Sequence, residues 1–178
     1  MLQEEAYAEI DRILAPWRQL IGRDYEGYHH HVCRVVSFAA LLQGDETVLE
    51  KWVIAGCFHD LGIWAEHTFD YLEPSISLAN RYLTEHGLER WTAEISAMIE
   101  WHHKVTPCDR ALGPLAEAFR RADWIDVTLG VRAFGLSRAA IQKIRRRFPN
   151  AGFHRCLTRL TLARTLRYPT SPLPMFRW

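Results

Sequence analysis

Apolar residues recur along most of this chain at the three- and four-residue spacing of helices that bury one face, and alternating strand patterns are scarce. Glycine, proline and aspartate interrupt the pattern and mark helix ends. The pattern predicts an all-α fold, a compact single-domain bundle of about seven or eight helices. The expected helices cover about residues 3–22 (kinked near Pro16), 26–43, 46–61, 74–86, 89–104, 112–128, 137–147 and 152–167.

Sequence features also indicate where one helix ends and where the helical domain ends. Gly62 follows the helix at 46–61, and we expect it to be the C-cap of that helix. The domain is expected to span residues 1–168, and residues 169–178 form a Pro-rich C-terminal arm. Because the arm contains Met175 and Phe176, we expect it to pack on the body or to cross to a second subunit and support a homodimer.

The composition places the chain among ordinary globular proteins. The first residues are acidic and lack the regions of a signal peptide, and no uncharged apolar run approaches the roughly 18 residues of a membrane helix. We therefore expect a cytoplasmic protein without a membrane segment. The four cysteines are widely spaced and include no C-x-x-C pair, so we expect reduced thiols.

Charge is divided unevenly along the chain. Residues 1–126 contain 21 acidic and 11 basic residues, whereas residues 127–178 contain 11 basic and no acidic residues. One interpretation is that the basic helices pack on the acidic body. The alternative is a surface within residues 138–167 for phosphate, nucleic acid or an acidic partner. Without interleaved exposed aromatic residues, sequence-specific nucleic-acid recognition is the weaker interpretation.

Three local motifs carry candidate chemistry. His31 begins an H-x-x-R-V motif on the second helix, the pair His59-Asp60 ends an apolar helix, and Asp123 lies in A-D-x-x-D. Two imidazoles and two carboxylates form a nitrogen–oxygen set suited to Mn, Fe, Co, Ni or Zn. Such a site leaves coordination positions for water and substrate, which is typical of a catalytic metal. The alternative for His31 is membership of a polar run, since two histidines precede it.

The order of these motifs, H…HD…D, resembles the HD superfamily of metal-dependent phosphohydrolases over about residues 26–128. The resemblance implies hydrolysis of a nucleotide or other small phosphate ester, a small anionic substrate. It also implies that a divalent metal is held by His31, His59, Asp60 and Asp123. In relatives the aspartate that follows alanine is the ligand, so Asp126 is expected to be a neighbouring hydrogen-bond or salt-bridge residue.

The sequence leaves open whether the site holds one metal ion or two. Some HD proteins bind a second ion through added histidines, and His102 or His103 lies about where one of these falls. The other added ligand has no clear counterpart; His67 and Glu73 are candidates, as is His86, which resembles a surface C-cap. A mononuclear site is the preferred interpretation, with the adjacent histidines lining the substrate pocket. Adjacent histidines at a helix end are expected to send at most one side chain straight to the first metal.

Further groups are candidates for the reaction. The metal ligand Asp60 could orient the attacking water, and the expected anion-contacting residues are His102, His103, Lys104 and Arg34, with Arg120 and Arg121 as further candidates. The alternative for Arg34 is an ion pair with a body carboxylate. The general acid is open among Glu66, His67 and Asp70. Two other functions remain: an HD-type di-iron oxygenase, which needs six ligands, and a metal-bearing regulatory or binding module with a basic C-terminal surface.

Overall fold

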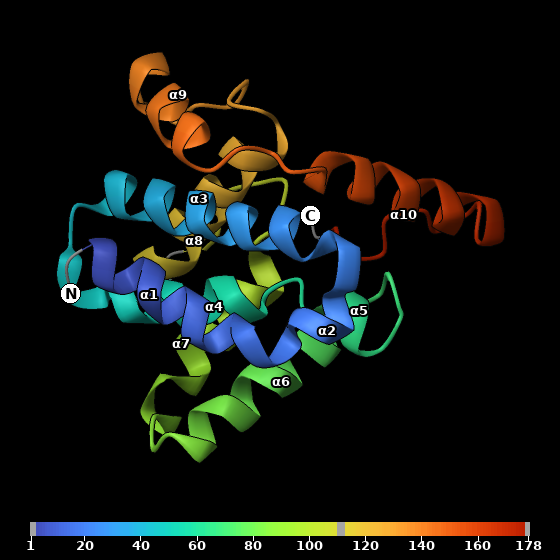
Figure 1. Ribbon diagram of the computed structural model, residues 1–178, viewed down its shortest axis with the longest axis horizontal. Coiled ribbons are helices and arrows are strands. Elements are labelled where there is room, and N and C mark those ends of the chain that lie inside the picture. Colours follow the sequence, from blue (N-terminus) through green and yellow to red (C-terminus); the bar gives the residue numbers. More distant parts are fainter. Residues whose placement is uncertain (1–2, 110–112, 177–178) are drawn as a thin grey trace.

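The computed structural model describes residues 3–109 and 113–176, and no strand occurs among them. Eight of its α-helices have ten or more residues, which confirms the predicted all-α bundle. Two single-turn helices, α2 and α5, complete the set (Figure 1). The bounds are α1 (Gln3–Leu14), α2 (Arg18–Ile21), α3 (Tyr25–Gln43), α4 (Leu49–Phe58), α5 (Gly62–Ala65), α6 (Leu72–Glu85), α7 (Thr92–Trp101), α8 (Gly113–Val127), α9 (Arg138–Arg147) and α10 (Phe153–Arg167).

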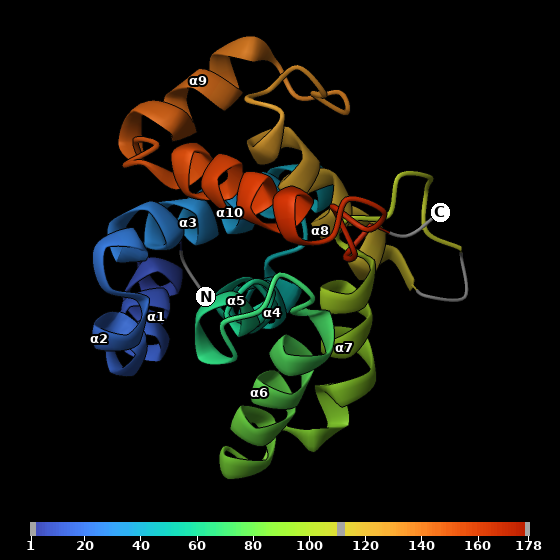
Figure 2. The same ribbon diagram turned by 90° about the vertical axis from the view of Figure 1, so that its right-hand side faces the viewer.

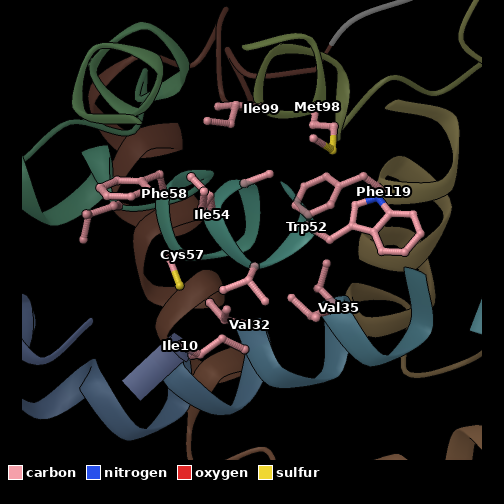
Figure 3. Close-up of a cluster of buried hydrophobic side chains, with 14 of the residues drawn as sticks. Ile10, Val32, Val35, Trp52, Ile54, Cys57, Phe58, Met98, Ile99 and Phe119 are labelled. Carbon is pink, nitrogen blue, oxygen red and sulfur yellow. The ribbon is translucent and has the colours of Figure 1, made fainter. Parts of the chain in front are cut away.

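Helix α4 lies at the centre of the bundle. All of its residues except Glu50 and Lys51 are buried, so the helix is apolar around its whole circumference. It packs against α1, α3, α6 and α7, and its side chains meet those of α3 and α7 in Figure 3. Large side chains such as Trp52 and Phe58 stabilise the fold by about 1.5–3 kcal/mol each when removed from water. The buried position of α4 fixes where its C-terminal end points.

The longest helix, α3, packs along α8, and α7 packs against both α6 and α8. Helices α9 and α10 lie on the other side of α3 and α8 from α6 and α7 (Figure 2). The C-terminal ends of α4 and α7 therefore approach the middles of α3 and α8 inside the bundle. This meeting point gathers residues far apart in sequence.

The helix ends differ from the expectation at three places. Short 3-10 turns replace α-helix at residues 46–48 and 89–91, whereas the 3-10 turn at residues 15–17 agrees with the break expected near Pro16. The prediction of Gly62 as a C-cap was wrong, because His59 caps α4 and Gly62 begins α5. A Cβ on Gly62 would lie 2.6 Å from the carbonyl oxygen of Tyr71. Glycine is needed there to let α5 touch the start of α6.

Two partly exposed ion pairs join the basic C-terminal helices to the acidic body, and a longer contact of 3.8 Å joins Arg145 Nη1 to the buried Asp126 Oδ1. Arg147 Nη2 lies 2.7 Å from Glu4 Oε2, and Arg159 Nη2 lies 2.7 Å from Asp24 Oδ2. Both pairs are partly exposed, so each contributes at most about 1 kcal/mol. Part of the basic charge therefore faces the body, as the first interpretation of the charge division expected.

The C-terminal arm folds back on the bundle. Met175 is buried, and the ring of Phe176 stacks in parallel on His103 with centroids 5.4 Å apart. Residues 177–178 lie outside the described part of the chain. The described section of the arm therefore covers one side of the residues at the end of α7.

Two observations concern the expected reduced thiols and the expected lack of a membrane segment. Cys33, Cys57, Cys108 and Cys156 are free thiols. Among the described residues, no helix combines the length and apolar character needed to cross a membrane.

Candidate metal centre

Six titratable side chains from four parts of the chain meet where α3, α4, α7 and α8 converge. They are His31 of α3, His59 and Asp60 after α4, His102 and His103 after α7, and Asp123 of α8. All six residues are buried. We call this set the donor cluster.

One half of the donor cluster is built on His31, His59 and Asp60. The Nε2 atoms of His31 and His59 are 3.0 Å apart. Asp60 Oδ2 lies 3.3 Å from His59 Nε2, and Asp123 Oδ1 lies 3.5 Å from His31 Nε2. These four residues are the ligands expected from the sequence.

The other half consists of Asp60, His102 and His103, whose ligand atoms also lie within 4.8 Å of one another. His102 Nε2 is 3.4 Å from Asp60 Oδ1, and His103 Nδ1 is 3.3 Å from Asp123 Oδ2. Both adjacent imidazoles thus reach the cluster, and neither belongs to the donor group of His31, His59 and Asp60. Both reach it because α7 ends at Trp101, and the following turn lets one ring present Nε2 and the other Nδ1.

The histidine rings are held with a free nitrogen toward the cluster. The Nδ1–H groups of His59 and His102 donate to the carbonyls of Gly56 and Ile99 at 2.7 and 2.6 Å. The Nδ1–H of His31 donates to Asp126 at 2.7 Å. Each of these rings then directs the Nε2 lone pair inward, as metal-ligating histidines do when a partner fixes their tautomer.

The unpartnered atoms of the cluster fit a divalent cation. Among the described residues, Asp60 Oδ1, His102 Nε2, His103 Nδ1 and both Asp123 oxygens are buried without a hydrogen-bond partner. Buried polar atoms normally have partners, because leaving one unsatisfied costs about 1–3 kcal/mol or more. Two inward lone pairs 3.0 Å apart beside carboxylate oxygens would repel one another without a positive charge between them.

Protonation states agree with this donor set. Burial lowers the pKa of His31 and His102, and lowers that of His103 to about 4, so these rings are neutral. Burial opposes the charge of His59, but the Asp60 carboxylate raises the pKa of His59. Burial would raise the pKa of Asp60, but His59 and His102 hold it well below its usual range. A bound cation would replace the proton that His59 attracts.

Comparison with protein families identifies this arrangement. The HD domain model matches residues 28–128, more than half of the chain. The chain belongs to the HD domain family. The family is part of a superfamily of metal-dependent phosphohydrolases, and the matched range contains every residue of the donor cluster. Comparison with curated proteins and with solved structures gave no match.

Next to the HD site, Asp126 anchors His31. One Asp126 oxygen accepts from His31, and the carboxylate also accepts from Arg34 Nε and Nη2 at 2.6 and 2.8 Å. Burial would raise the pKa of Asp126, but His31 and Arg34 hold it far below its usual range. The third nitrogen of Arg34 donates to the carbonyls of Phe148 and Pro149, both at 3.0 Å. The geometry therefore supports the ion-pair alternative for Arg34, since each of its three guanidinium nitrogens donates to a group of the protein.

The other expected anion-contacting side chains contact neighbouring groups of the protein. Lys104 follows His103, and its ammonium group lies 5.4 Å from the centre of the Trp101 ring. Arg120 and Arg121 both bind Glu117.

The structure keeps the remaining candidates out of the donor cluster. His67 and Glu73 are exposed, as are Glu66 and Asp70, the other expected general acids. His86 is also exposed and donates to the Tyr82 carbonyl at the end of α6, as a surface C-cap does. Neither three-residue donor group found among the described residues includes any of them.

Tyr71 is a site residue that the sequence did not reveal. Its hydroxyl lies 2.8 Å from His103 Nε2, and the side chain is buried. When the lone pair of His103 Nδ1 faces the cluster, Nε2–H donates to this hydroxyl. A tyrosine just before an amphipathic helix is normally interpreted as a core residue. The sequence signal that points to the site is the short separation of Tyr71 from the His59-Asp60 pair.

Replacing Tyr71 with phenylalanine is expected to lower metal affinity about 10- to 100-fold, because the orientation of His103 is lost. Isothermal titration with Mn²⁺ measures this change. Tyr28→Phe is the matched control, since the buried Tyr28 hydroxyl donates to the Cys57 carbonyl at 2.9 Å and makes no hydrogen bond to the ring of a cluster histidine. Equal effects of the two substitutions would contradict the positioning role of Tyr71.

Proposed function

We propose that this protein is a metal-dependent phosphohydrolase that acts on a nucleotide or other small phosphate ester. The observation that carries the proposal is the buried set of inward lone pairs and unpartnered carboxylate oxygens within the HD domain. Such a set has no stabilising role of its own, because buried polar atoms without partners destabilise a fold. It supports a site built for a cation and an anionic substrate.

In this proposal His31, His59, Asp60 and Asp123 hold the ion. A divalent ion bound there lowers the pKa of a water molecule and neutralises charge on phosphoryl oxygens. Asp60 directs Oδ2 to His59, while its Oδ1 has no hydrogen-bond donor among the described residues, so in a mononuclear site Oδ1 would be free to orient the attacking water. Burial of the ligands excludes bulk water and strengthens these interactions.

The geometry supports a second ion more than the sequence did. Asp60 belongs to both three-residue donor groups and offers a different oxygen to each. His102 and His103 supply nitrogen ligands to the second group. We therefore expect a dinuclear site in which Asp60 would be a ligand of both ions, with the mononuclear site as the alternative.

Replacing His102 with alanine separates these alternatives. A dinuclear site is expected to lose about one ion per chain, because the second group keeps only two donors. A mononuclear site keeps its metal content and shows weaker substrate binding or turnover. Elemental analysis of the purified variant, together with phosphatase assays, gives both quantities. Unchanged metal content and unchanged turnover would contradict both versions.

One observation favours a second function. The oxygenase alternative needs six ligands, and the donor cluster contains six candidate residues. Metal identity distinguishes the two functions. Two irons per chain would favour the oxygenase, whereas Mn, Co, Ni or Zn with release of phosphate would favour hydrolysis.

The direct test of hydrolysis is metal analysis followed by a phosphatase screen over nucleotides and sugar phosphates. We expect phosphate release that stops after chelation and returns when the ion is restored. A metal-loaded protein that releases phosphate from none of these esters would contradict the proposal.

A further inference from the structure

A cavity of about 390 Å³ lies between α10 and the segment that joins α5 to α6. Ile63 and Trp64 form part of its wall, and Arg159, Arg164 and Arg167 line it from α10. Its volume falls within the range of about 300–1,000 Å³ that is typical of small-molecule sites. Residues of the donor cluster do not contribute to this wall.

The charge of the cavity wall is predominantly positive. Asp24 is the one acidic residue in the wall, and Arg159 already pairs with it. Among the described residues no carboxylate forms an ion pair with Arg164 or Arg167; both guanidinium groups lie over the ring of Tyr168, at 4.2 and 5.4 Å. Positive charge in a concave, partly apolar wall attracts anions more strongly than the same charge on a flat surface.

The opposite wall contains a backbone conformation that side chains rarely adopt. His67 has a φ of +49° and lines the cavity together with Thr68. The left-handed region is uncommon for non-glycine residues, but histidine is among those that adopt it most often, and Leu129, Phe134 and Ala151 adopt it outside the cavity wall. This observation is independent of the arginines on α10.

Two aromatic rings separate the cavity from the donor cluster. Trp64 lines the cavity, and its ring packs on Tyr28 with centroids 4.8 Å apart. Tyr28 in turn lies 6.2 Å from the His59 ring and is fully buried. A molecule in the cavity therefore meets a different set of residues from a molecule at the donor cluster.

We propose that this cavity is a second binding site, for a small organic anion with a phosphate group on an apolar body. Arg164 and Arg167 bind the phosphate through charge-assisted hydrogen bonds, for which guanidinium groups are well suited. Ile63, Leu160 and Ala163 contact the apolar part. The inference does not rest on the proposed hydrolysis, because the site requires no metal.

Calorimetric titration of phenyl phosphate into the full-length, chelator-treated protein tests the proposal. We expect a dissociation constant of about 1 mM or lower, weaker binding of inorganic phosphate, and no binding of benzyl alcohol. Arg167→Gln is expected to weaken phenyl phosphate about tenfold. Arg155→Gln is the matched control, because Arg155 is exposed on the same helix and outside the cavity wall.

A second variant fills the cavity and leaves the arginines of its wall unchanged. Ala163→Phe is expected to abolish binding, whereas Ala139→Phe, at an exposed position of α9, leaves it unchanged. Thermal melting shows that each variant is folded.

Four outcomes would overturn the inference. The first three are no binding to the chelated wild type, equal losses in Arg167→Gln and Arg155→Gln, and full binding by Ala163→Phe. Binding that needs the metal and is lost in His59→Ala, but not in Arg167→Gln, would place the phosphate at the donor cluster. That result would overturn the second site and support the proposed function.

Discussion

Replacing His59 or Asp60 with alanine is expected to remove the bound metal and the phosphatase activity together. Each substitution deletes a ligand from a fully buried site, and Asp60 serves both donor groups. Loss of the ion forfeits several kcal/mol of transition-state stabilisation, about a thousandfold or more in rate. Elemental analysis and phosphate-release assays on the purified variants measure the two losses.

His29→Ala is the control for this prediction. His29 lies two residues before His31, but it pairs with Asp11 at 2.6 Å and is outside the donor cluster. The control should keep its metal and its activity. Metal-loaded, active His59→Ala or Asp60→Ala protein would show that the ligands are assigned wrongly.

Replacing Asp126 with alanine is expected to lower the free energy of unfolding by about 3–5 kcal/mol. The substitution leaves the Arg34 guanidinium, which is 1% exposed, without the carboxylate that neutralises it. It also removes the acceptor that holds His31 Nδ1. Urea denaturation of the chelated protein measures the loss of stability, and metal titration measures the expected fall in affinity.

The double variant Arg34→Met with Asp126→Ala tests whether the instability of Asp126→Ala comes from the unpaired charge of Arg34 or from the lost side-chain volume. Removing both charges should recover a large part of the stability lost by Asp126→Ala, since no unpaired buried charge remains. A double variant as unstable as the sum of the two single variants would contradict the ion-pair explanation.

Much of the fold was predictable from local sequence. The helix at 26–43 ends at Gln43, and Gly44 follows it with φ +70°, as a C-cap glycine does. The apolar spacing also places His31 and Asp123 on helices and the pair His59-Asp60 at the end of one. Local sequence does not show that these helices converge, because convergence depends on tertiary packing. The resemblance to the HD superfamily predicted it.

Other parts depend on contacts that sequence spacing does not encode. Gly62 resembled a C-cap, whereas its lack of a Cβ serves a 2.6 Å approach to the Tyr71 carbonyl, 9 residues later in the chain. Arg34 resembled a phosphate ligand until the fold placed it against Asp126 and the carbonyl groups that follow α9. His102 and His103 both reach the cluster because α7 ends one residue before them.

The enclosed position of α4 has a consequence for hydrogen exchange. Its amides are shielded by α1, α3, α6 and α7, so their protons should exchange with solvent only when the whole domain unfolds. The amide of His59 donates to the Ala55 carbonyl at 2.9 Å and continues this helix into the donor cluster. An ion at a hundred times its dissociation constant adds about 2.7 kcal/mol to the stability of the native state. Exchange along α4 should then slow about a hundredfold, although none of the amides within the helix touches the ion.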